Sequence, residues 1–160
     1  MNPAPVPPVR KSVIVRADTS HAFRVFTECL DSWWPRTHHI GKSPMTKTFI
    51  EGHAGGRCYS EQEDGTQCDW GTVTAWEPPH RLVLAWQITH EWGYEPDLNQ
   101  ASEVEILFRA QPDGSTLIDL EHRRLERHGA GATALRLAID SQGGWGLLLQ
   151  LYVAAAEKAE

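Results

Sequence analysis

Apolar and charged positions alternate over residues 102–111, with Val104, Ile106, Phe108 and Ala110 on one face and Glu103, Glu105 and Arg109 on the other. This pattern predicts a strand with one buried face and one wet face. The segment 112–114 (Pro-Asp-Gly) fits a three-residue turn with glycine in the left-handed position. We therefore expect a hairpin that pairs Phe108 with Ile118, Ile106 with Leu120, and Val104 with His122. This register puts His122 on the buried face and Glu121 on the solvent face.

Four further stretches have the alternation or the β-branched and aromatic content of strands: residues 9–15, 46–51, 67–77 and 81–88. Another strand is expected directly after Gly55-Gly56. The junctions carry glycine pairs, Asp-Gly or Pro-Pro, which allow positive φ or end a ladder. The sequence thus predicts one curved antiparallel sheet of six to seven strands.

Helical spacing is found at two places. Ala22, Phe23, Phe26 and Leu30 repeat at this spacing between the capping residues 18–20 and Pro35, which predicts one or two short helices after the first strand. Near the carboxyl end one apolar stripe predicts a long helix packed on the sheet, formed by Trp145, Leu148, Leu149, Tyr152 and Ala156. Glycines at 143, 144 and 146 predict a kink or a close approach to the sheet near Trp145.

Tryptophan is unusually frequent, and four of the seven lie on or beside residues 67–92: Trp70, Trp76, Trp86 and Trp92. This is more aromatic bulk than a thin core between two layers needs, so we expect the sheet to line an internal pocket. The polar loop at residues 90–101 is long enough to fold over the opening of such a pocket, as a lid.

The length and charge of the chain exclude several classes of protein. The 160 residues fit a single domain over residues 9–160, behind a flexible proline-rich leader at residues 1–8. The net charge is −6, and no cluster of Lys and Arg exceeds two residues, so nucleic acid is not expected as a partner. Neither a membrane-spanning run nor a signal peptide is recognisable, which predicts a cytoplasmic protein with no membrane contact.

The three cysteines show no metal or redox spacing and are expected to be reduced. A hairpin turn at residues 63–65 would place Ser60 opposite Cys68 and Cys58 opposite Trp70. In that arrangement Cys58 and Cys68 are diagonal neighbours, just beyond disulfide reach.

Five segments carry a resemblance to a known family: residues 55–57 (Gly-Gly-Arg), 69–73 (Asp-Trp-Gly-Thr-Val), 77–82 (Glu-Pro-Pro-His-Arg-Leu), Trp86, and 144–145 (Gly-Trp). Over residues 9–158 the chain resembles the START-like (SRPBCC) superfamily, in its branch named for activators of the heat-shock protein 90 ATPase. The resemblance implies the α+β helix-grip fold, in which a curved sheet wraps around a long carboxy-terminal helix. It also implies a mostly apolar cavity for small hydrophobic or aromatic ligands.

The resemblance does not identify a reaction. Some members of the superfamily are enzymes, but no universal catalytic residue accompanies the fold. The eukaryotic co-chaperone behind the branch name carries an additional amino-terminal domain, so a chaperone ATPase is not the expected partner here. We expect a small hydrophobic or aromatic molecule as ligand and leave a homodimer open.

Nine residues are expected to approach the cavity: Phe49, Tyr59, Trp70, Trp86, Phe108, His122, Trp145, Leu149 and Tyr152. His122 could equally be a core histidine bonded to a backbone carbonyl. The pairs His38-His39 and His90-Glu91 have no metal spacing and are expected to be solvated. We assign no catalytic residue, no metal and no cofactor.

Three functions follow, from different classes. The first is binding of a small hydrophobic or aromatic molecule, as a carrier, sensor or sequestering protein. The second is an enzyme acting on such a molecule, with His122 or a residue of the loop 90–101 as acid or base. The third is a module that contacts a chaperone ATPase.

Overall fold

The computed structural model describes residues 6–39 and 42–158. Seven strands form one antiparallel sheet in the order β1-β7-β6-β5-β4-β3-β2. The strands are β1 (Val9–Val15), β2 (Met45–Ile50), β3 (Arg57–Gln62), β4 (Gln67–Glu77), β5 (Arg81–Trp86), β6 (Ser102–Ala110) and β7 (Thr116–Arg123).

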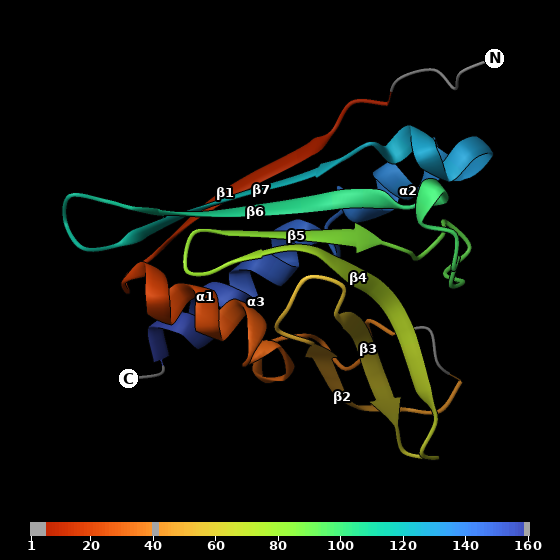
Figure 1. Cartoon of the computed structure of the whole chain (residues 1–160), viewed down its shortest axis with the longest axis horizontal. Coiled ribbons are helices and arrows are strands. Elements are labelled where there is room, and N and C mark those ends of the chain that lie inside the picture. The colour runs from red at the N-terminus through yellow and green to blue at the C-terminus, as the bar shows by residue number, and fades with distance from the viewer. Residues whose placement is uncertain (1–5, 40–41, 159–160) are drawn as a thin grey trace.

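Helices cover one side of this sheet. The elements are α1 (Thr19–Thr27), η1 (Leu30–Ser32), η2 (Leu98–Gln100), η3 (Leu125–Gly131), α2 (Ala132–Ile139) and α3 (Trp145–Lys158). Figure 1 shows α1 and α3 on the same side of the strands. The helix-grip architecture predicted from the sequence is confirmed.

The sheet is strongly curved because β4 bends along its length (Figure 1). The register shifts between Cys58 and Tyr59 and again between Val73 and Ala75, and such bulges increase the bend of a strand. A Cβ at Gly71 would collide with the carbonyl oxygen of Ala85, so glycine permits the close approach of β4 and β5. The bend turns β2 and β3 away from the long strands.

The first of these bulges corrects one sequence expectation. Ser60 lies opposite Cys68 as expected, but Cys58 lies opposite Gly71 and not opposite Trp70, because the extra residue shifts the ladder by one. All three cysteines are free thiols. Cys58 is completely buried, and burial raises the pKa of its thiol.

The register of the β6–β7 hairpin is confirmed. Val104 pairs with His122, Ile106 with Leu120, and Phe108 with Ile118. His122 is 0% exposed. On the opposite face, the carboxylate of Glu121 forms ion pairs with Arg10 at 2.7 Å and with Arg123 at 3.1 Å.

Three predicted strand limits differ slightly from the structure. The strand predicted at 46–51 spans Met45–Ile50, the one at 81–88 ends at Trp86, and the one at 102–111 ends at Ala110. Beyond the end of β5 the chain leaves the sheet, and Ile88 forms only an isolated bridge to Tyr94. Alternation does not reveal such an ending because Ile88 is still buried.

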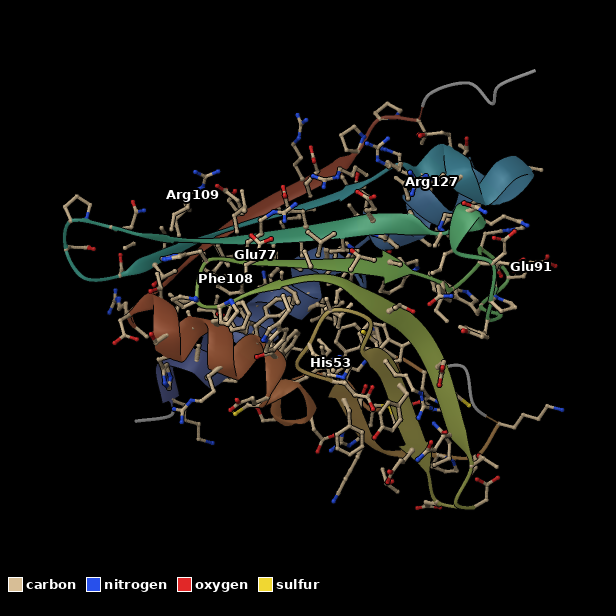
Figure 2. The ribbon with its side chains drawn as sticks, viewed as in Figure 1. His53, Glu77, Glu91, Phe108, Arg109 and Arg127 are labelled. Atoms are coloured by element: carbon tan, nitrogen blue, oxygen red, sulfur yellow. The ribbon has the colours of Figure 1, made fainter. Side chains whose placement is uncertain are left out.

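The middle of the core is aromatic. Phe108 projects from β6 toward α1, whereas its neighbour Arg109 lies on the other face of the sheet (Figure 2). The ring of Phe108 makes edge contacts with Phe23 and Phe26 of α1, at centroid distances of 5.1 and 5.8 Å. Tyr152 of α3 also packs on Phe26, at 5.1 Å. These rings join α1, α3 and the sheet.

The described part of the expected leader, residues 6–8, lies against the rest of the fold. The side chain of Arg136 in α2 donates hydrogen bonds to the carbonyl oxygens of Pro7 (2.7 Å) and Pro8 (3.2 Å). Val6 packs against the edge of the core. The expectation of a flexible segment at residues 1–5 lies outside the described residues.

Candidate functional site

A pocket of about 470 Å³ opens at the end of the sheet where β2–β5 face the junction between α2 and α3. Its sheet wall, its loop wall after η1 and its helical wall come from three distant parts of the chain. The lining residues are Trp34, Thr37, His38, His39, Met45, Thr48, Ser60, Trp70, Trp86, Ile88, Trp92, Ala138, Ile139, Ser141, Gly143, Gly144, Trp145 and Leu148.

Four buried indoles form the main apolar surface, which we call the tryptophan box: Trp34, Trp70, Trp86 and Trp145. Trp34 and Trp70 stack with an interplanar angle of 16° and a centroid distance of 5.4 Å. Trp145 stands nearly perpendicular to Trp34 (76°) and at 62° to Trp86. These are favourable geometries for aromatic pairs, so the box holds its shape through its own contacts.

Hydrogen bonds fix three of the four indoles. The Nε1–H of Trp34 donates to the carbonyl of His38 (2.9 Å), and that of Trp70 donates to Oγ1 of Thr48 (3.2 Å). The Nε1–H of Trp145 donates to Nδ1 of His122 (3.0 Å). The buried Nε1–H of Trp86 has no partner among the described residues.

The box stays hollow because small residues stand opposite the large ones. Thr48 and Ser60 contribute short side chains from the sheet, and Ala138, Gly143 and Gly144 do so from the helical wall. Of these residues, Thr48 contacts an indole through its hydrogen bond with Trp70, and the short side chains leave the space beyond them open. The vacancy therefore follows from the pairing of large with small side chains.

Gly144 also sets the position of α3. A Cβ at this residue would collide with the carbonyl oxygen of Ile139, the last residue of α2. Of the two expectations for these glycines, a kink or a close approach to the sheet, the structure shows a tight turn of the backbone against the end of α2. It brings Trp145, the first residue of α3, into the wall of the pocket.

Behind Trp145 lies a buried polar chain, which we call the histidine chain: His122, Ser102 and His128. Ser102 Oγ is 2.7 Å from Nε2 of His122 and 2.7 Å from Nε2 of His128. The backbone N–H of Ser102 also donates to Nε2 of His128, at 3.2 Å. Ser102 and His122 are both completely buried.

The donors determine the direction of this chain. Because Nδ1 of His122 accepts from Trp145, its proton is on Nε2 and is donated to Ser102. Ser102 in turn donates its hydroxyl proton to His128. Burial lowers the pKa of His122 to about 3, and burial together with the nearby His90 lowers the pKa of His128 to about 4. Both imidazole rings are neutral at pH 7, as the hydrogen bonds of the histidine chain require.

His122 is thus a core histidine, although its partners are Trp145 and Ser102 and not a backbone carbonyl. It does not line the pocket. It orients Trp145, which does. A neutral imidazole with both nitrogens engaged is poorly suited to take up a proton.

Two other histidines are closer to the pocket than expected. His38 and His39 are half-buried and line the pocket, although the sequence predicted solvated residues. Nε2 of His38 donates to the carbonyl of Gly143 (2.8 Å), which joins the loop after η1 to the helical wall. Nδ1 of His39 is buried without a partner among the described residues.

The loop 90–101 contributes Trp92 to the pocket. Trp92 is 52% exposed and has a positive φ of 61°, a strained conformation for this residue type. Glu91 lies at the outer tip of the same loop (Figure 2). Its carboxylate is 3.9 Å from Nε2 of His90 and is exposed to solvent.

The nine expected site residues divide into three groups. Trp70, Trp86 and Trp145 line the pocket. Phe108, His122, Leu149 and Tyr152 are buried in the core and do not line it. Phe49 and Tyr59 do not approach it either. They pair with each other at a centroid distance of 5.1 Å, on the face of β2 and β3 opposite to the lining residues Thr48 and Ser60.

Sequence reasoning missed Trp34, the two loop histidines and the small residues of the helical wall. The doublet Trp33-Trp34 before Pro35 was a signal for Trp34. No local pattern marks Ser60 or Ala138, because their role depends on which indole lies opposite.

The match to a protein family covers residues 16–154, and the family is described as activator of Hsp90 ATPase homolog 1-like protein. The chain belongs to this family. A comparison with curated protein sequences gave no significant match.

Solved structures with the same fold include two proteins that share substantial sequence identity with the chain. Txn09, named as an anthrahydroquino-γ-pyrone synthase, is 38% identical, with a TM-score of 0.66 over 94% of this chain and 97% of that protein. CalC from Micromonospora echinospora, named as a self-sacrificing resistance protein, is 30% identical, with a TM-score of 0.69 over 95% of each chain.

A third structure shows how widely the fold occurs. Protein NE0264 from Nitrosomonas europaea is only 14% identical, yet it has a TM-score of 0.66 over 98% of this chain and all of its own. This likeness concerns the fold alone. The family fold is a ligand-binding fold, and Txn09 and CalC differ in what their names say they do.

Metal chemistry finds no support in the described side chains. Residues 6–39 and 42–158 contain no cluster of three or more His, Cys, Asp or Glu that could hold an ion. Within the same ranges, no helix is long and apolar enough to cross a membrane. What the site offers is an apolar aromatic enclosure with a few polar atoms, the usual composition of a small-molecule site.

Proposed function

We propose that this protein binds a small, flat aromatic molecule in the tryptophan box, as a carrier, sensor or sequestering protein. The observation that carries the proposal is the pocket of about 470 Å³ with four ordered indoles in its wall. Its volume lies within the range of about 300–1,000 Å³ that small-molecule pockets occupy. Rigid indoles lose little freedom when a ring packs on them, which favours aromatic ligands.

Titration with tricyclic aromatic compounds tests this function. Binding should quench tryptophan fluorescence, because four of the seven tryptophans form the box. A compound at 100 times its dissociation constant should also raise the free energy of unfolding by about 2.7 kcal/mol. If aromatic compounds neither quench fluorescence nor raise the melting temperature, the proposal is wrong.

The second candidate is an enzyme acting on a polycyclic aromatic substrate. It is favoured by the 38% identity to a protein named as a synthase of an anthrahydroquino-γ-pyrone. The acid or base expected from the sequence was His122 or a residue of the loop 90–101. His122 lies behind Trp145 and does not line the pocket, so His39 is the better candidate: it lines the pocket, and its buried Nδ1 has no hydrogen-bond partner among the described residues. Turnover of a polyphenolic substrate that is lost in His39→Gln and kept in His53→Gln, a surface control, would support catalysis.

The remaining predictions from the sequence concern the location in the cell, the partners and the oligomeric state. We retain a cytoplasmic location and the absence of a nucleic-acid partner as predictions, and a homodimer stays open. Contact with a chaperone ATPase is the least favoured function, in spite of the family name. Co-purification with such an ATPase and a change in its rate would be needed to support it.

A further inference from the structure

Two tight turns of the sheet have the same backbone geometry. In residues 62–66 and again in residues 111–115, the first N–H donates to the last carbonyl (2.9 Å in both turns). The N–H of the fourth residue donates to the first carbonyl (3.0 Å in both turns). This fourth residue is left-handed, with φ of 86° at Gly65 and 88° at Gly114. It is the usual three-residue loop of a β-hairpin, in which glycine fills the left-handed position.

A third turn, at residues 89–93, has the same two hydrogen bonds and a different residue at that position. The N–H of Thr89 donates to the carbonyl of Gly93 (2.8 Å), and the N–H of Trp92 donates to the carbonyl of Thr89 (2.9 Å). Trp92 has φ of 61° and thus stands where the other two turns have glycine. A bulky residue is strained in this conformation because its Cβ approaches the backbone too closely.

Contacts with other aromatic side chains do not offset the strain at Trp92. Trp92 is 52% exposed, whereas the other six tryptophans are buried or half-buried. Each of those six packs on another aromatic ring. No aromatic pair within residues 6–39 and 42–158 includes Trp92. The turn therefore carries an indole whose faces are open to solvent.

The position of this indole gives the strain a purpose. Trp92 lines the same pocket as the tryptophan box. The base of its turn is tied to the sheet, because the N–H of Glu95 donates to the carbonyl of Gln87 (2.8 Å) and the Gln87 side chain accepts from Oγ1 of Thr72 (2.7 Å). Strained residues of this kind are concentrated at ligand sites, where the surrounding structure holds them in place.

We propose that Trp92 is a ligand-binding residue, whose indole packs on the part of the aromatic ligand nearest to solvent. The inference rests on the proposed binding function and adds a residue that determines the affinity of the same site. The tryptophan box supplies four buried indoles, and Trp92 supplies a fifth that gains its aromatic partner only when the ligand binds. Tryptophan stands at the left-handed position of this turn because glycine has no side chain to make that contact.

Hydroxyl-radical footprinting read by mass spectrometry tests the contact in the unaltered protein. The probe is 9-fluorenone, a neutral tricyclic aromatic compound, at a saturating concentration. It should slow the oxidation of Trp92 severalfold. Tyr94 is the internal control, because it is 41% exposed on the same loop and does not line the pocket. Its oxidation should change only by the amount of radical that the probe consumes. Equal protection of the two residues would overturn the proposal.

Two variants separate the indole from the backbone strain. Trp92→Gly and Trp92→Ala both delete the indole, so equilibrium dialysis should show roughly tenfold weaker binding of 9-fluorenone by each. Glycine fits the left-handed position and alanine does not, so Trp92→Gly should melt roughly 2–4 °C higher than Trp92→Ala. Tyr94→Ala is the matched control and should keep the affinity of the original chain.

The readouts distinguish ligand contact from a structural role. If Trp92 only stabilised its turn, Trp92→Gly would lower the melting temperature and leave the affinity for 9-fluorenone unchanged. Equal melting temperatures of Trp92→Gly and Trp92→Ala would contradict the strained turn on which the inference depends. Circular dichroism establishes that each variant is folded.

The outcomes also separate this inference from the binding function. If the original chain does not bind 9-fluorenone, the binding function fails for this compound, and the inference fails with it. If the original chain binds but neither variant of Trp92 is weakened, Trp92 is not a ligand-binding residue and the binding function stands. Protection of Trp92, with weaker binding by both of its variants and unchanged binding by Tyr94→Ala, supports the inference.

Discussion

Two aromatic clusters lie along α3, and only one of them is filled. Toward the carboxyl end of the helix, Tyr152 packs against Phe26, which in turn contacts Phe108, and the tyrosine hydroxyl donates to the carbonyl of Ala22 (2.7 Å). At the amino-terminal end, Trp145 packs on Trp34 and Trp86, and the tryptophan box that they form with Trp70 lines a pocket of about 470 Å³. One helix therefore contributes to both a solid core and a cavity.

The difference lies in the neighbours and not in the aromatic residues themselves. The filled cluster is surrounded by large, fully buried aliphatic side chains such as Leu30, Ile106 and Ile118. The pocket beside the tryptophan box is also lined by short side chains such as those of Ser60 and Ala138. Close packing is the norm in protein interiors, so a vacancy of this size requires small residues at several positions at once.

Truncation in the filled cluster should have the largest effect. Phe108→Ala should lower the free energy of unfolding by about 3–5 kcal/mol, because it leaves a cavity among Phe23, Phe26 and Ile118 that rigid neighbours cannot close. Urea unfolding followed by circular dichroism measures the loss.

The matched change in the hollow cluster is Trp34→Ala. It removes a larger ring, yet it should cost less stability than Phe108→Ala, since one side of Trp34 already faces the pocket. An equal or larger loss in Trp34→Ala would show that the two clusters are packed alike.

Filling the hollow cluster should abolish its function with little effect on the fold. Ala138→Phe adds a ring from α2 into the pocket and should weaken the binding of a tricyclic aromatic compound by roughly a hundredfold, equivalent to about 2.7 kcal/mol. Ala134→Phe is the control, because Ala134 is exposed on the same helix. If both variants bind the aromatic compound equally well, the ligand is not in the tryptophan box.

Acid should lower the free energy of unfolding through His122, which holds Trp145 of the tryptophan box in place. Burial lowers the pKa of His122 from 6.5 to about 3, so below pH 6.5 the unfolded chain binds a proton that the folded protein excludes. Stability is therefore complete above pH 6.5 and falls with pH until about pH 3. Each pH unit corresponds to about 1.4 kcal/mol, which gives about 2 kcal/mol between pH 6.5 and pH 5.

His122→Gln provides the comparison for this prediction. Urea titrations at pH 7, 6 and 5 should give a smaller loss of stability on acidification for the variant than for the original chain, by about 2 kcal/mol at pH 5. Identical pH profiles would mean that His122 is not held neutral.

The smallest effect is expected from a single polar atom in the filled cluster. Tyr152→Phe deletes the hydroxyl that donates to Ala22 and should lower the free energy of unfolding by about 1 kcal/mol. Thermal unfolding measures the change, and the binding of tricyclic aromatic compounds should be unaffected. A loss of binding would show that the two clusters are coupled along α3.

Much of the fold could be predicted because its signals are local. The alternation in residues 102–111 and the turn after it determined the β6–β7 register, and the apolar stripe of residues 145–156 located α3. The bulge that places Cys58 opposite Gly71 was not predictable in this way, because alternation along one strand does not show where its partner strand carries an extra residue. Helix-grip topology came from family motifs and was confirmed.

The site was less predictable, since a cavity depends on residues that are far apart in sequence. Trp70, Trp86 and Trp145 could be identified as large residues on buried faces. Phe49 and Tyr59 could not be excluded without knowing the register of β2 and β3, which puts both on the outer face. The contribution of Gly144 depends on the position of α2, and no pattern around residue 144 contains that information.

The histidine chain has only one sense, because an indole nitrogen can give a proton to a hydrogen bond but cannot receive one. It begins at Trp145 in the pocket wall and ends at His128, which is only partly buried. A ligand that tilts Trp145 must therefore alter the hydrogen bonds of His128, a ring that the ligand does not contact. The ¹⁵N resonances of His128 should therefore change when a ligand occupies the pocket, although His128 does not line it.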